Sequence, residues 1–433
     1  IPSVSADNPR PTPQTNTPDH PVPAKHHHQQ LHLVKLAPYL HSVPRVAAAL
    51  TVRLVPVEHW ASAVAFCSFV VAAGVAVVVF ICARDVTADL APGVAIGIRL
   101  ALGLAVILVP ASPHEVLGNL ANIHWYLLWA MPWVLFYVPR TWWGASVLAL
   151  VALSAATSEI QTVVFAPLIL WRVRIPRTIP VKALYLAGLI AQAVTTIHAP
   201  RAQSDNPKID LMSLVDGFFI NGVMTIFLPR EGVGGVLAAT GPWIGVIFAL
   251  PFVFAMWWVL RRRSDATANQ RLFTAVLILS SVILYVTAVE VTPKAAYGYA
   301  GFTREYLEVA WISRYGIFPA VSFLAVSIIA LTIPAKHGSH TQTRWALRAC
   351  VGGVLLAVVL IHFVPRGPTL RAGEPDYPSQ IADWRIRCDH LPPAERVPIE
   401  AAPTTLQDLP GRGTKPAVTY WELSLTCARV RGG

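Results

Sequence analysis

Four residues able to do chemistry lie close together just before a long apolar stretch: Glu115, Asn119, Asn122 and His124. Carboxylate and imidazole groups often act as general bases or acids, and an amide offers both donors and an acceptor. On a helix, part of this set would share one face. We therefore predict that Glu115 and His124 are catalytic and that Asn119 and Asn122 bind substrate. The structural alternative is that the amides cap a helix and that Trp125 anchors a membrane interface.

Two further polar segments separate apolar runs. Glu159 stands in the sequence TSEIQ, where its carboxylate faces either the same cavity or solvent in a turn, and we predict that it binds substrate. The loop 198–240 surrounds an apolar run, 217–228, which we expect to form an in-plane or re-entrant helix. Around this run the loop carries several charged residues, among them Asp205, Asp210, Asp216, Arg230 and Glu231.

The segment 303–315, TREYLEVAWISRY, adds Arg304, Arg314 and Tyr315, which we also predict to bind substrate. A guanidinium group offers paired donors to phosphate oxygens, so Arg314 is suited to a lipid phosphate at the membrane edge. Pairing with Glu308, or extension of the side chain toward the interface, is the structural alternative.

Membrane-spanning helices must position these residues, because the composition is that of a polytopic membrane protein. Hydrophobic residues make up 55% of the chain, the mean hydropathy is +0.53 and charged residues are only 13%, compared with about 25% in soluble domains. We predict an all-α fold with about ten transmembrane helices. The expected spans are 61–83, 91–110, 122–138, 143–157, 160–171, 181–197, 241–260, 272–291, 316–334 and 346–364. The short pair 143–157 and 160–171 forms either two spans or one re-entrant hairpin.

The distribution of Lys and Arg sets the orientation, because short basic loops stay in the cytoplasm. The basic breaks all fall on one side of the ten spans: Arg140, Arg172, Arg174, Arg177, Arg261, Arg262, Arg263, Arg271, Lys336, Arg344 and Arg348. Both chain ends are then outside, in a multi-pass protein of the cell membrane. The first methionine is Met131 and no signal peptide precedes the outer N-terminal segment, so we expect a truncated or processed chain.

The chain divides into four expected parts. Residues 1–38 are polar and proline-rich, and we expect them to be disordered. Residues 39–60 are expected to form an interfacial amphipathic helix, 61–365 the transmembrane domain and 366–433 an extracytoplasmic tail. Within the tail, Cys388 and Cys427 can pair in an oxidising compartment. The closed loop of about 40 residues would stabilise the tail by roughly 3–4 kcal/mol.

Several other functions are excluded or left without a site. The net charge of +11 does not indicate nucleic-acid binding, because the cytoplasmic loops account for much of it. The sequence GRGTKP at 411–416 lacks the spacing of a nucleotide-binding loop. The flexible histidines His26, His27, His28 and His32 lack the fixed geometry of a zinc site. Arg99, in the middle of a span, is expected to pair with a buried carboxylate such as Glu290.

Three runs resemble recurring segments of the bacterial GT-C superfamily of polytopic glycosyltransferases and their uncharacterised relatives. These runs are YLHSVPR at 39–45, EVLGNLANIHWYLL at 115–128 and SRYGIFPA at 313–320. The resemblance covers most of the chain in layout, but the first helix is lacking. In such enzymes an outer-loop Asp or Glu after that helix acts as base or metal ligand. No carboxylate before Tyr39 supplies this group convincingly, since Asp7 and Asp19 lie in low-complexity sequence.

The resemblance implies transfer of a sugar from a polyprenyl-phosphate donor to a cell-envelope acceptor at the outer membrane face. Glu115 and His124 would handle the acceptor, and Arg45 and Arg314 would contact the lipid phosphate. No cofactor is identified, and the need for a divalent metal stays open. A transporter or lipid flippase, or an inactive membrane scaffold, is the alternative function. No internal repeat of the kind that builds many carriers is found.

Overall fold

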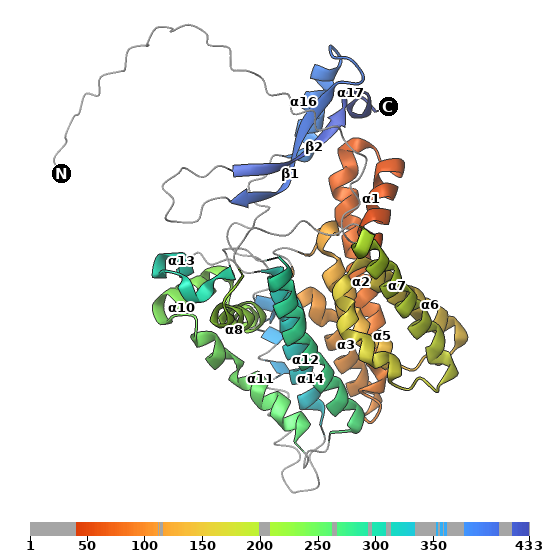
Figure 1. Ribbon diagram of the computed structural model, residues 1–433, viewed down its shortest axis with the longest axis vertical. Helices are drawn as coiled ribbons and strands as arrows, with labels where there is room; N and C mark the ends of the chain where they lie inside the picture. The colour runs from red at the N-terminus through yellow and green to blue at the C-terminus, as the bar shows by residue number, and fades with distance from the viewer. Residues whose placement is uncertain are drawn as a thin grey trace, which may run out of the picture. The chain divides into compact units, whose positions relative to one another are not determined.

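The computed structural model describes residues 40–110, 112, 116–198, 208–261, 266–292, 297–308, 313–333, 352–353, 356–357, 359–361, 376–406 and 418–432. These residues are predominantly helical (Figure 1). The predicted disorder of residues 1–38 and most of the predicted span 346–364 fall outside them. Glu115, one of the two predicted catalytic residues, also lies outside the described residues.

The helices follow the apolar runs of the sequence. They are α1 (Ser42–Leu54), α2 (Trp60–Cys82), α3 (Pro92–Leu108), α5 (His124–Phe136), α6 (Trp142–Ser158), α7 (Ile179–His198), α8 (Leu211–Phe219), α9 (Thr225–Phe227), α10 (Arg230–Thr240), α11 (Ile244–Leu260), α12 (Ala268–Val291), α13 (Arg304–Glu308), α14 (Ile317–Thr332), α16 (Tyr377–Cys388) and α17 (Cys427–Val430). A 3₁₀ segment, η4 (Ile160–Leu170), follows α6, and a π-helical turn, η6 (Ile220–Met224), joins α8 to α9. Shorter 3₁₀ turns are Val57–His59, Ala83–Asp85, Leu120–Asn122, Pro176–Thr178, Tyr299–Gly301 and Arg314–Gly316.

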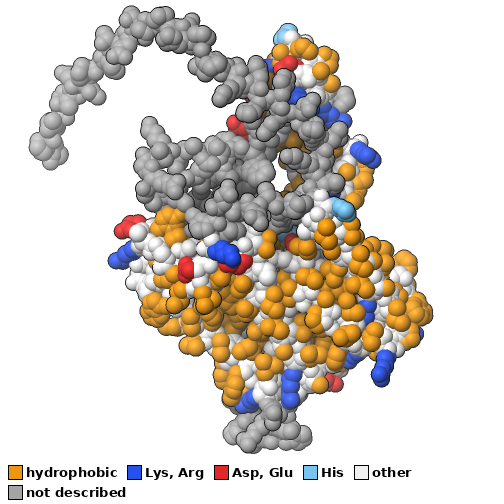
Figure 2. Space-filling model, in the orientation of Figure 1, with side chains coloured by type: hydrophobic (Ala, Val, Ile, Leu, Met, Phe, Trp, Pro, Cys, Tyr) orange, Lys and Arg blue, Asp and Glu red, His pale blue; other side chains and the backbone are white. Residues whose placement is uncertain are grey.

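Each predicted span from 61–83 to 316–334 coincides with a described helix, but many of these helices are short. By length and composition, four helical segments are long and apolar enough to cross a membrane: Val57–Asp85, Pro176–His198, Ala268–Val291 and Arg314–Thr332. The number rises to five if α10 and α11, which meet at a bend of 113°, count as one span. The prediction of ten spans is therefore met in part. Figure 2 shows a broad apolar surface over the helices on the face drawn.

The central helix is α5, and its burial explains its sequence. All of its residues are buried, including the large rings of Trp129 and Trp133. Trp129 packs against Phe318 of α14, with ring centroids 5.7 Å apart, and Trp133 against Phe273 of α12 at 4.3 Å. A helix that is apolar on every face is stable only when other elements surround it. Its first residue, His124, is thereby held at one end of the helical core.

The connecting segments gather at two ends of the helical core. At one end Arg172 pairs with Asp85 at 2.9 Å, and Arg177 donates to the carbonyl of Arg140. At the other end Glu159, between α6 and η4, contacts His124. Both α6 and η4 therefore run from one end to the other. With 11 residues, η4 extends roughly 22 Å at the 3₁₀ rise of about 2 Å per residue. Both segments are shorter than the helices that are long enough to cross a membrane, so the two alternatives for 143–171, two spans or one re-entrant hairpin, both stay predictions.

The apolar run 217–228 lies in the broken helix α8–η6–α9, which packs between α11, α12 and α14. Its centre is the fully buried Asn221 in the π-helical turn. The side-chain amide donates to the Tyr299 hydroxyl at 3.0 Å and accepts from the Ser313 N–H at 2.6 Å. An isolated π turn often occurs at a functional position. Here it lets one buried side chain join three segments.

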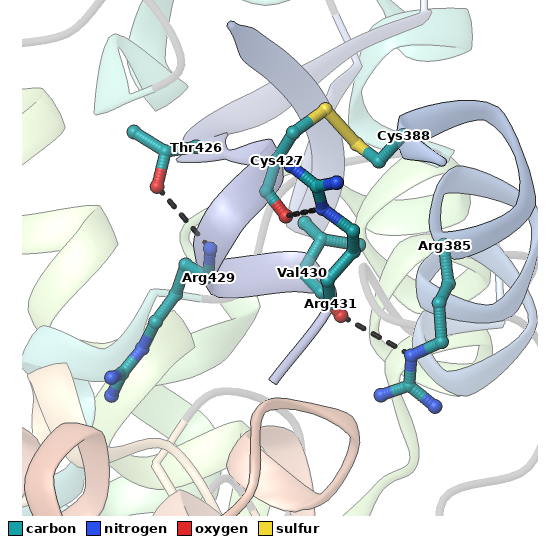
Figure 3. The surroundings of a disulfide bond; sticks show 7 residues. All are labelled: Arg385, Cys388, Thr426, Cys427, Arg429, Val430 and Arg431. Carbon is teal, nitrogen blue, oxygen red and sulfur yellow. Dashed lines mark hydrogen bonds between the residues drawn. A yellow bond between two sulfur atoms is a disulfide. The ribbon is translucent and has the colours of Figure 1, made fainter. Parts of the chain in front are cut away.

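The C-terminal segment forms a small unit that includes strands as well as helices. Strands β1 (Arg396–Leu406) and β2 (Val418–Thr426) pair antiparallel, with an irregular register between Ala401 and Thr405. The predicted all-α fold did not include this hairpin. A disulfide joins Cys388 to Cys427, the pair singled out in the sequence (Figure 3). Around it, Arg385 donates to the carbonyl of Val430 and Arg431 to that of Cys427.

This unit shares an apolar core with the start of α2. Val57 and Trp60 pack with Ile381, Val397 and the disulfide. Glu58 pairs with Arg385 at 3.2 Å. The core thus extends beyond the predicted boundaries of the tail, 366–433. The expected interfacial helix 39–60 is likewise shorter, because α1 ends at Leu54 and Trp60 begins α2.

Arg99 binds a different partner from the one predicted. Its Nε donates to the carbonyl of Phe80 at 2.8 Å, and its guanidinium lies 4.2 Å from the centroid of the Phe80 ring. Among the described residues no ion pair joins Arg99 to Glu290, which lies in the last turn of α12. A backbone carbonyl and an aromatic face therefore compensate this charge in place of a carboxylate.

Candidate functional site

Two predicted site residues, His124 and Glu159, meet at one end of the helical core. His124 Nε2 lies 3.3 Å from Glu159 Oε2, and the two side chains are only 11% and 12% exposed. They come from different parts of the chain: His124 begins α5, and Glu159 follows the last residue of α6. We call this pair the His124–Glu159 dyad.

Local caps fix both members of the dyad. Gly118 adopts a positive φ of 77°, which favours glycine, and Asn119 then accepts a hydrogen bond from the Ala121 N–H at 3.1 Å. The resulting 3₁₀ turn leads directly into α5. Glu159 caps η4 in the same way, because its Oε1 accepts from the Gln161 N–H at 3.1 Å. The capping role considered for Asn119 is therefore present in the structure.

The hydrogen bonds of the dyad determine how many protons it holds. His124 Nδ1 lies 2.9 Å from the Ala121 carbonyl oxygen, which can only accept, so Nδ1 carries a hydrogen. A neutral imidazole would then turn a lone pair toward the Glu159 carboxylate, which is repulsive. The contact requires a second proton between Nε2 and Oε2, as an imidazolium with a carboxylate or as an imidazole with a carboxylic acid. The dyad is therefore a proton-sharing pair.

The start of α1 covers the dyad. The His41 ring meets the His124 ring edge-on at a centroid distance of 5.0 Å. His41 adopts a left-handed conformation with φ 47° immediately before α1. Two bonds hold this turn on α6: Ser42 Oγ lies 2.5 Å from Thr157 Oγ1, and the Val43 N–H donates to Ser158 Oγ at 3.1 Å. His41 was not predicted as a site residue, although it stands in the run YLHSVPR.

An aromatic wall continues from the dyad to the start of α14. The Trp125 ring lies 5.5 Å from the His124 ring and 5.6 Å from that of Tyr315. Tyr315 also contacts Tyr297 at 5.6 Å, and the Arg314 guanidinium lies 5.4 Å from the Tyr315 ring centroid. Of the predicted residues, Tyr315 therefore contacts Trp125, the ring next to the dyad, and Arg314 lies against Tyr315.

A buried hydrogen-bond centre supports this wall from behind. Asn221 holds the Ser313 N–H, one residue before Arg314. Gly316 packs so closely on this turn that an added Cβ would lie 2.2 Å from the Asn221 carbonyl oxygen. Asn221 was not predicted as a site residue, because an amide inside an apolar run does not indicate a partner such as Ser313, 92 residues away.

The remaining predicted residues are placed differently. Asn122 is buried in the turn before α5. Arg304 is exposed at the first residue of α13, and Arg45 is half-buried on α1. No contact in the described part of the chain joins the side chain of Arg45 or Arg304 to the dyad. The described residues also contain no group of three or more His, Cys, Asp or Glu side chains that could hold a metal ion.

The described geometry thus offers a shared proton, an aromatic wall that starts at the dyad, and a guanidinium beside the Tyr315 end of this wall. All of them lie at the end of the core away from the basic loops. Such a set suits proton transfer to or from a ligand that carries hydroxyl and phosphate groups. Comparisons with known protein families, with curated proteins and with solved structures find no match to this chain.

Proposed function

We propose that this chain is a membrane glycosyltransferase that moves a sugar from a polyprenyl-phosphate donor to a cell-envelope acceptor at the outer membrane face. The observation that carries the proposal is the contact between His124 and Glu159, which joins an imidazole and a carboxylate 35 positions apart. An acid–base pair of this kind is what the attack of a hydroxyl group requires.

In the proposed reaction Glu159 accepts the proton of the acceptor hydroxyl. The acceptor oxygen attacks the anomeric carbon of the sugar, and the bond from that carbon to the phosphate oxygen breaks. His124 keeps the carboxylate oriented through Nε2, while its Nδ1 is fixed on the Ala121 carbonyl. The leaving polyprenyl phosphate gains negative charge. Arg314, beside Tyr315, supplies positive charge there, and Arg45 on α1 is the second candidate.

The test is sugar transfer by the purified protein in lipid vesicles, with a radiolabelled sugar on undecaprenyl phosphate as donor and cell-envelope polysaccharide as acceptor. Glu159→Gln keeps the size and the cap to Gln161 but removes the base, so we expect transfer to fall roughly 10²–10⁴-fold. Glu305→Gln, an exposed carboxylate on α13, is the matched control. Full transfer by Glu159→Gln would remove the dyad from the reaction.

The same dyad supports a proton-coupled transporter as the second candidate. A shared proton held between helices of a membrane protein is a common feature of proton relays. Vesicles that contain the protein and a pH-sensitive dye distinguish the two functions. Proton movement that depends on Glu159 in the absence of any donor would favour the transporter, whereas transfer without proton movement favours the enzyme.

A further inference from the structure

A crevice of about 350 Å³ lies between α3, α14 and the helical residues around Leu356. Gly97, Ala101 and Ala105 form its recessed wall on α3, and Leu324, Ile328 and Leu331 form the opposite wall on α14. All of the residues that line it carry hydrocarbon side chains or none. It is more than twice the size of the roughly 150 Å³ apolar cavities that stay dry and take up benzene.

The two faces of α3 differ in how closely other helices approach. On one face, a Cβ added at Gly103 would lie 2.6 Å from the carbonyl oxygen of Ala76, so α2 fills this side. On the crevice face, a Cβ added at Gly97 would meet nothing within 4 Å. Gly97, Ala101 and Ala105 are spaced four residues apart and therefore stack along one side of the helix. The small residues thus create a groove along α3 that no described side chain fills.

The crevice opens sideways onto apolar surface. Leu100 at its edge is 51% exposed and Leu356 is 52% exposed. The neighbouring surface is also apolar, with exposed Ile96 on α3 and exposed Leu360 and Ile361 beyond Leu356. In a membrane this opening faces lipid hydrocarbon, since α14 belongs to a segment long and apolar enough to span.

The walls determine what can occupy the crevice. A buried water molecule needs two to four polar partners, and the lining side chains offer none. If the crevice were empty, the side chains that line it would lack van der Waals contacts on that side, which is unfavourable. Leu324 lies nine residues after Tyr315, or roughly 14 Å deeper along α14, so the crevice is at hydrocarbon depth. We propose that one acyl chain of a bilayer phospholipid occupies it as a resident ligand. This proposal is independent of the proposed enzyme activity.

The test uses the full-length protein in nanodiscs that contain phosphatidylglycerol with a diazirine group in its acyl chain. After illumination, labelled residues are located by peptide mass spectrometry. Label is sought at the two wall positions Leu324 and Ile328. Leu324 is the more diagnostic of the two, because it is only 3% exposed and general lipid around the protein does not reach it, whereas Ile328 is half-buried. We expect both positions to be labelled in the wild type.

Two matched glycine variants separate the crevice from the general lipid surface. Gly97→Leu places a side chain in the groove, and we expect labelling of Leu324 and Ile328 to fall at least five-fold. Gly93→Leu, on the same helix, also meets nothing within 4 Å but does not line the crevice, so labelling should stay unchanged. Ala101→Phe provides a second filling variant if Gly97→Leu fails to fold.

Three outcomes would overturn the proposal. They are the absence of label at Leu324 and Ile328 in the wild type, equal labelling of the Gly97→Leu and Gly93→Leu proteins, and loss of the label when farnesyl phosphate is added. The last outcome would assign the crevice to a prenyl chain in place of a phospholipid.

Discussion

Replacement of Asn221 by leucine should destabilise the protein more than any comparable change of a surface amide. The side chain is fully buried and makes four hydrogen bonds: to the Gly217 carbonyl at 2.8 Å, the Tyr299 hydroxyl at 3.0 Å, the Tyr285 hydroxyl at 3.3 Å and the Ser313 N–H at 2.6 Å. Leucine has a similar size and keeps none of them. The loss therefore reports on polar contacts and not on a cavity.

The expected magnitude follows from the setting of these bonds. Hydrogen bonds between membrane helices average about 0.6 kcal/mol each. The Ser313 N–H would in addition lose its partner while still buried, which costs roughly 1–3 kcal/mol. The tyrosine hydroxyls can rotate toward other acceptors and recover part of the loss. We expect the free energy of unfolding to fall by roughly 2–4 kcal/mol.

The assay is reversible unfolding of the purified protein in mixed micelles with increasing SDS, followed by circular dichroism. Asn269→Leu is the matched control, because among the described residues the one hydrogen bond of the Asn269 side chain is a long one of 3.4 Å, accepted from Arg172. Asn221→Asp keeps an acceptor for Ser313 and should lie between leucine and the wild type. The reasoning is refuted if Asn221→Leu unfolds with the same free energy as Asn269→Leu.

Three further predictions concern the disulfide, the N-cap of α8 and the close packing of Gly217. Replacing Cys388 and Cys427 by serine opens a loop with a sequence separation of 39, so the free energy of unfolding of the C-terminal unit should fall by roughly 3–4 kcal/mol. The measurement is the rate of proteolysis of that unit, which should rise. An unchanged rate would contradict this prediction. Hydrogen bonds from the side chain and backbone of Ser213 lower the pKa of Asp210, the N-cap of α8, below its ordinary 3.8. This cap therefore stabilises α8 fully above that value and is lost as pH falls through the lower folded pKa. The protection factors of the α8 amides, that is the intrinsic exchange rate at each pH divided by the observed rate, should therefore fall on acidification in the wild type but not in Asp210→Asn. Gly217→Ala should destabilise the protein by about 1–3 kcal/mol, because the new Cβ would lie 2.3 Å from the Tyr285 hydroxyl oxygen. In the control Gly235→Ala, the new Cβ meets nothing within 4 Å. Equal melting temperatures for the two variants would be inconsistent with this packing.

The helices could be predicted from the sequence because long apolar runs in a membrane protein form few structures other than helices. The grouping of the basic breaks on one side agrees with the contact between Arg177 and the Arg140 carbonyl, whereas the pairing of Arg172 with Asp85 was not predicted. The β1–β2 hairpin was not predicted, although residues 418–426 contain the β-branched and aromatic residues typical of strands. The hairpin was missed because the tail was interpreted from its polar composition and its cysteines, and not from the pattern of residues in each segment.

For the candidate site, residue types were predictable and their pairing was not. His124 and Glu159 were both selected, but for separate places, because the contact depends on how α5 and α6 pack. Asn119 was predicted to bind substrate, and the structure gives it a capping bond. For Arg99, the need for a partner to its charge was predicted but the partner was not. A carboxylate was expected, and the structure provides the carbonyl and the aromatic ring of Phe80.

The most direct test of the central claim, that His124 and Glu159 act as one acid–base unit, is a double-mutant cycle in the sugar-transfer assay. The rates of wild type, His124→Ala, Glu159→Gln and the double variant are compared under one set of conditions. Residues that act as a unit lose their effect together, so we predict that the double variant is no slower than the slower single variant. Single effects that multiply in the double variant, or single variants with wild-type rates, would contradict the account.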